Sequence, residues 1–94
     1  GRLVESAVGA HLYNQKSQGI ELHYWRERNH EVDFVVSDGN RLLAIEVKSG
    51  RKASALPGLK KFMSTFPSAK PLVVGTGGVS IEEFLLTAPA QWLS

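Results

Sequence analysis

Apolar residues follow a helical spacing at the start of the chain and a two-residue alternation after it. Between residues 3 and about 16 the spacing of three and four gives a helix one buried stripe, made by Leu3, Val4, Ala7, Val8, Ala10 and Leu12. We expect this helix to end near Gly19. Residues 20–26 are rich in β-forming side chains and predict a strand, with a turn around Asn29.

The next two strands are predicted to form a hairpin. In residues 31–37 alternation separates two sets of side chains: Val32, Phe34 and Val36 on one face, and Glu31, Asp33 and Val35 on the other. Residues 38–40 (Asp-Gly-Asn) have the composition of a tight turn. Residues 41–49 form the returning strand, with Leu43, Ile45 and Val47 on one face and Leu42, Ala44, Glu46 and Lys48 on the other.

The second half of the chain predicts a helix, a buried strand and a short last helix. Pro57 suits the first turn of a helix whose core-spaced residues are Leu59, Phe62, Met63 and Phe66. Residues 72–75 form a short apolar run, which is typical of a strand covered on both faces and follows a connection bracketed by Pro67 and Pro71. Ser80 is the expected N-cap of the last helix, which Pro89 is expected to end.

The predicted order is α-β-β-β-α-β-α, an α/β fold. It combines an antiparallel hairpin with a right-handed helical crossover to a parallel strand, and so gives a mixed four-stranded sheet flanked by helices, with a short C-terminal helix. With 94 residues, the chain is expected to form one domain over residues 1–94. Because it starts at Gly1 in helical material, we expect it to be a fragment of a longer protein.

Three charged residues are predicted to share one face of the hairpin. Glu46 and Lys48 lie two residues apart on one strand and therefore project the same way. A two-residue loop at Asp38-Gly39 or at Gly39-Asn40 places Asp33 opposite residue 44 or 46, and either register brings it to the face of Glu46 and Lys48. A slip of one residue would separate them.

This arrangement favours a divalent-metal site. Two carboxylates on neighbouring strands repel each other unless a cation lies between them. Magnesium prefers hard oxygen ligands and takes one or two protein carboxylates together with water and phosphate oxygens. Asp33 and Glu46 are the candidate ligands, Lys48 the candidate electrostatic catalyst, and Glu5, beside the apolar stripe of the first helix, a fourth candidate catalytic residue.

The chain resembles the DUF4143 domain along nearly its whole length. The resemblance is carried by residues 1–5 (GRLVE), 24–26 (YWR), 31–36 (EVDFVV), 45–50 (IEVKSG) and 58–62 (GLKKF). It implies the PD-(D/E)XK nuclease-like superfamily, with its restriction-endonuclease-like αβββαβ core and its helix glutamate, strand aspartate and Glu-x-Lys motif on Glu5, Asp33, Glu46 and Lys48. It further implies Mg²⁺ or Mn²⁺, a nucleic-acid substrate, and attachment to the ATPase region of a prokaryotic AAA-type ATPase. Many members of the superfamily bind without cutting.

Each of these interpretations has a simpler alternative. The three charged residues of the hairpin can form a solvated ion-pair face, and Glu5 can be an exposed residue of the first helical turn. Positive charge after the strand could follow a phosphate backbone or belong to a solvated surface; it lies on Arg51, Lys52, Lys60 and Lys61. Tyr24 and Trp25 could stack on bases, although one of the two is expected in the core, and the three histidines are expected to be ordinary surface or packing residues.

Composition excludes several kinds of chemical site and of location. The chain has no cysteine, which excludes disulfides, thiolate metal sites and cysteine nucleophiles. It has no apolar run of membrane-spanning length and no signal peptide, so we expect a cytoplasmic protein without a membrane partner. Two alternatives to a nuclease-like domain acting on DNA remain open: a non-catalytic binding module of an ATPase, and a domain that dimerises through an uncovered face.

Overall fold

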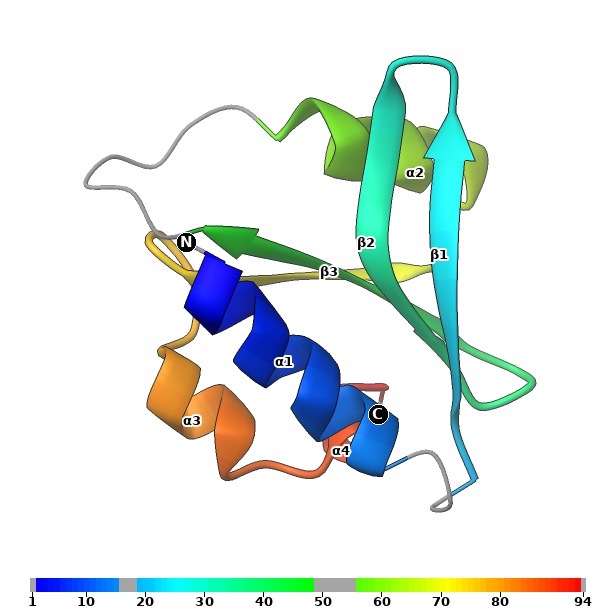
Figure 1. Ribbon diagram of the computed structural model, residues 1–94. Helices are drawn as coiled ribbons and strands as arrows, with labels where there is room; N and C mark the ends of the chain where they lie inside the picture. Colours follow the sequence, from blue (N-terminus) through cyan, green and yellow to red (C-terminus); the bar gives the residue numbers. More distant parts are fainter. Residues whose placement is uncertain (1, 16–18, 49–55, 94) are drawn as a thin grey trace.

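The computed structural model describes residues 2–15, 19–48 and 56–93. The elements follow the predicted order with one added helix (Figure 1). They are α1 (Arg2–Asn14), β1 (Glu21–Glu27), β2 (His30–Ser37), β3 (Leu42–Lys48), α2 (Pro57–Thr65), β4 (Lys70–Gly75), α3 (Ile81–Leu85) and α4 (Pro89–Leu93). The longest of these helices has 13 residues, and none in the described ranges has the length and apolar character needed to cross a bilayer.

The four strands form one mixed sheet in the order β1-β2-β3-β4. β1 pairs with β2 and β2 with β3 in antiparallel fashion, and β3 pairs with β4 in parallel. Phe34 lies opposite Ile45 and Ser37 opposite Leu42, which is the register predicted for a loop centred on Gly39-Asn40. Asp38 holds this turn, because its Oδ1 accepts the backbone N–H groups of Asn40 and Arg41 at 2.9 and 2.7 Å.

Helices cover both faces of the sheet. α1, α3 and α4 lie over one face (Figure 1). On that face Val8 and Leu12 of α1 pack against Leu43 and Ile45 of β3. α2 covers the other face, and a second cluster joins Leu59, Phe62, Val32, Val35 and Ala44 there. The α/β class, the sheet and the flanking helices are therefore as predicted, and so are the two faces of β3.

A β-bulge interrupts the predicted alternation of β2. Val32 and Val35 were expected on opposite faces, yet both pack against α2. The reason is a shift in the pairing with β1: Trp25 lies opposite Val32 and His23 opposite Val35, so that Asp33 and Phe34 together face the single residue Tyr24. The predicted alternation is therefore wrong at this point. The prediction that Asp33 shares the face of Glu46 and Lys48 is wrong as well: Asp33 follows Val32 and projects toward α1, whereas Glu46 lies between Ile45 and Val47, which pack on the α1 side, and so projects the other way.

Two predictions about proline are also wrong. Pro71 lies inside β4 rather than before it, on an edge strand where a missing N–H is tolerated. Pro89 does not close the chain's last helix but begins a further one, α4, because a proline is well suited to the first turn of a helix. Ser80 caps α3 as predicted and accepts the backbone N–H of Glu83 at 3.0 Å.

Candidate functional site

A small acidic pocket opens between α1, β2 and β3. β2 and β3 pair only as far as Phe34 and Ile45, whereas β3 continues beside β4 to Lys48. The next residue of each strand, Asp33 and Glu46, therefore flanks the opening between β2 and β3. The pocket measures about 80 Å³, enough for a few water molecules, and it is lined by Glu5, Glu31, Asp33, Phe34, Ile45, Glu46 and Val47.

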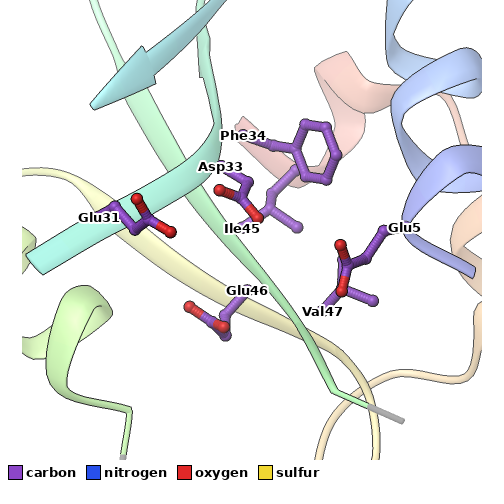
Figure 2. A pocket seen from close by; sticks show the side chains of 7 residues that line it. All are labelled: Glu5, Glu31, Asp33, Phe34, Ile45, Glu46 and Val47. Atoms are coloured by element: carbon purple, nitrogen blue, oxygen red, sulfur yellow. The ribbon is translucent and has the colours of Figure 1, made fainter. Parts of the chain in front are cut away.

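Four carboxylate side chains from three elements line this pocket (Figure 2). Asp33 and Glu31 of β2, Glu46 of β3 and Glu5 of α1 are arranged around the opening, with Glu5 and Glu31 on opposite sides of it in this view. The bulge explains this placement, since it changes the direction of the β2 side chains just where the strand leaves β3. Lysine and arginine are absent from the described residues that line the pocket.

The electrostatics of the pocket work against ionised carboxylates. Partial burial raises the pKa of Asp33, and the negative charges of Glu31 and Glu5 raise it further. Burial is also the main reason that the pKa of Glu46 is raised, with smaller contributions from Asp33, Glu5 and Glu31; Lys48 acts in the opposite direction. The site is thus a concentration of negative charge that a bound cation would relieve.

The pocket is not a closed cage of ligands. Within the described ranges, no three His, Asp or Glu side chains are grouped closely enough to hold a metal ion by themselves. Two carboxylates with water in the remaining positions suffice for Mg²⁺, however, and Asp33 and Glu46 offer that number. Asp33 has no hydrogen bond or ion pair with other described residues, so its oxygens remain open to a ligand.

The structure brings together three of the four predicted catalytic residues, namely Glu5, Asp33 and Glu46. Lys48 does not line the pocket, but its charge acts on Glu46. Glu31 was not predicted as a site residue. A signal for it was present, because Glu31 lies two residues before Asp33 on the same strand.

Tyr24 contacts Glu31, one of the residues that line the pocket. Its hydroxyl donates a 2.7 Å hydrogen bond to Glu31 Oε2, and its side chain is 56% exposed. This bond is the largest cause of a raised pKa of Tyr24. Trp25 points the other way and packs edge-on against Phe62 in the core under α2, so the two aromatic residues take different roles.

The other residues considered for a site are dispersed. Arg51 and Lys52 fall outside the described residues. Lys60 is exposed on α2, and Lys61 lies 3.7 Å from Glu27 of β1 in an ion pair. His11 has a packing role, since its Nε2 lies 3.0 Å from the carbonyl oxygen of Thr87 and its ring meets Phe84 edge-on.

Together the fold and the pocket define a class of protein: an α/β domain with a mixed four-stranded sheet and an acidic pocket where two central strands separate. The chain belongs to the family described as "Domain of unknown function (DUF4143)", whose model matches residues 1–89. No curated protein matches the chain.

Proposed function

We propose that this chain is a metal-dependent nuclease-like domain of the PD-(D/E)XK superfamily that acts on DNA phosphodiesters. The observation that carries the proposal is the convergence of Asp33 and Glu46 on one pocket, with Glu5 beside them. The order of these residues, from helix to strand to strand, and the Glu-x-Lys spacing of Glu46 and Lys48 fit the pattern of that superfamily. The whole chain, residues 1–94, is proposed to be this one domain.

The donor set of the pocket fits Mg²⁺ or Mn²⁺. All its charged groups are carboxylates, which are hard oxygen ligands, and their repulsion favours a divalent cation. Asp33 and Glu46 would hold the ion. When bound, such an ion polarises a phosphate and lowers the pKa of a bound water.

The remaining residues supply positioning and charge. Lys48 follows Glu46 by two residues on β3, so its ammonium group is placed to attract a phosphate that approaches this edge of the sheet. Glu5 approaches from α1, opposite to Glu46, and would accept a hydrogen bond from the attacking water. The phosphate would thus meet a positive group on β3 and a hydrogen-bond acceptor on α1.

A cleavage assay tests this function. Supercoiled and branched DNA are incubated with Mg²⁺ or Mn²⁺ and with the wild type, Asp33→Ala or Lys48→Ala. Asp38→Asn is the matched control, because Asp38 is an acid of the β2–β3 turn that holds Arg41 and does not line the pocket. We expect cleavage by the wild type and the control only; equal rates in all four proteins would remove the catalytic role.

A second candidate function is a non-catalytic nucleic-acid- or protein-binding module of an AAA-type ATPase. The spacing of the pocket carboxylates favours it, since no three of the described His, Asp or Glu residues form a ready metal cage. Calorimetric titration with Mg²⁺ separates the candidates: a pure binding module takes up no ion in a manner that depends on Asp33 and Glu46. Under either function we place the domain in the cytoplasm, attached to an ATPase region N-terminal to it.

A further inference from the structure

The β1–β2 hairpin carries two arginines without an acidic partner. Arg26 lies near the end of β1, and Arg28 begins the two-residue loop that joins Glu27 to His30. Both are exposed, and among the described residues neither forms an ion pair or a hydrogen bond with another side chain. This end of the hairpin projects past β3 and β4, at the top of Figure 1.

The nearby acids are engaged elsewhere. Glu27, between the two arginines, pairs with Lys61 of α2 at 3.7 Å. Glu31 lies directly opposite Arg26 in the strand pairing, yet its carboxylate accepts the hydroxyl of Tyr24 and lines the acidic pocket. The hairpin therefore exposes two arginines that form no ion pair among the described residues, and one of them, Arg26, lies opposite a residue that lines the acidic pocket.

Arg28 also has an unusual backbone conformation. Its φ of 56° lies in the left-handed region, which glycine adopts freely and which costs another residue about 1 kcal/mol or more. A positive φ at the first loop position is what a two-residue hairpin turn requires, and glycine would satisfy it without strain. An arginine at this position is strained where a glycine would not be. Because arginine adds a long cationic side chain that glycine lacks, its presence here indicates that the positive charge has a function.

We propose that Arg26 and Arg28 bind the phosphate backbone of the nucleic acid whose cleavable phosphodiester lies at the acidic pocket. This inference rests on the proposed function and names the surface that holds the substrate. An acidic pocket repels a polyanion, so binding needs cations beside it. Arg26 fits this need, since it shares its face of the hairpin with Glu31, which lines the pocket, and with Tyr24, which is hydrogen-bonded to Glu31.

The test measures DNA binding apart from cleavage. A fluorescent duplex and a single strand of equal length are titrated with the protein in calcium and in EDTA, over salt concentrations of about 50 to 200 mM. The variants are Arg26→Gln, Arg28→Gln and their lysine counterparts. Arg41→Gln is the matched control, because Arg41 is an exposed arginine at the opposite end of β2 that pairs with Asp38 at 2.9 Å.

Each glutamine variant should lower the slope of log K against log salt by about 0.9 for duplex DNA, which is roughly an eightfold loss of affinity at 0.1 M salt. The lysine variants should retain most of the affinity, and Arg41→Gln should bind like the wild type. If Arg26→Gln and Arg28→Gln bind DNA as tightly as Arg41→Gln does, the proposed DNA-binding surface is wrong. A wild type that binds no DNA would also overturn the proposal. Binding that depends on both arginines without any cleavage would support the surface and count against the nuclease activity.

Discussion

Neutralising Asp33 should stabilise the domain when no divalent ion is present. Asp33 makes no hydrogen bond or ion pair with other described residues, so Asp33→Asn loses no favourable contact. It removes a charge that is disfavoured by partial burial and by the neighbouring Glu31 and Glu5. Repulsions of this kind contribute a few tenths of a kcal/mol each, so we expect a gain of about 1 kcal/mol in the free energy of unfolding.

Divalent ions should reverse the order of stability of the wild type and Asp33→Asn. A gain of about 1 kcal/mol raises the Tm of a domain of this size by roughly 4–8 °C in metal-free buffer. A ligand present at ten times its Kd stabilises the wild type by about 1.4 kcal/mol, and Asp33→Asn should lose most of that gain. The wild type should therefore be the less stable protein in EDTA and the more stable one in Mg²⁺, as measured by thermal unfolding at low ionic strength.

The pH dependence of the stability difference between Asp33→Asn and the wild type supplies an internal control. Because the pKa of Asp33 is raised in the folded state, the unfolded carboxyl ionises first as the pH climbs through its ordinary value of 3.8. The wild type loses stability from there until the pH passes the raised pKa, and the deficit persists above it. The advantage of Asp33→Asn should thus be full at pH 7 and vanish below pH 3.8. A variant that is less stable than the wild type in EDTA at pH 7 would refute the reasoning.

Three further predictions concern the contact of α2 with β2, the cap of α3 and the charge around Glu46. Gly58→Ala should destabilise the domain by about 1–3 kcal/mol in urea unfolding, because its Cβ would meet the carbonyl oxygen of Glu31 and push α2 away from β2; a neutral effect would contradict this close approach. Ser80→Ala should cost about 1 kcal/mol through loss of the α3 cap, with Ser80→Asn retaining it. Lys48→Met should raise the pKa of Glu46, followed by NMR titration; an unchanged pKa would show that the ammonium acts elsewhere.

Local sequence rules were sufficient for most of the fold. The turn at residues 38–40 set the register of β2 against β3, since the Asp38 side chain caps the loop that brings Phe34 opposite Ile45. That register also predicted that Asp33 and Glu46 would share a face. Both line the pocket, but the bulge turns Asp33 toward α1 instead of onto the face of Glu46. Alternation along β3 correctly separated Ile45, which packs under α1, from Ala44, which packs under α2.

The bulge in β2 depended on information that alternation does not contain. A bulge arises from competition between two neighbouring strands, here the need to bury both Val32 and Val35 under α2 while Phe34 packs on the opposite face. The role of Glu31 at the pocket follows from this bulge and from its bond to Tyr24 across the hairpin. The spacing within the strand places Glu31 on the face of Asp33, but the bulge and the bond to Tyr24 depend on the pairing with β1, which is a tertiary property.

The most direct test of the central claim is a crystal structure of the domain soaked in manganese, with anomalous scattering used to locate the ion. The account predicts an anomalous peak in the acidic pocket, within coordination distance of Asp33 and Glu46, that is lost in Asp33→Ala. A well-ordered pocket without such a peak at saturating Mn²⁺, or manganese bound equally in the variant, would contradict it.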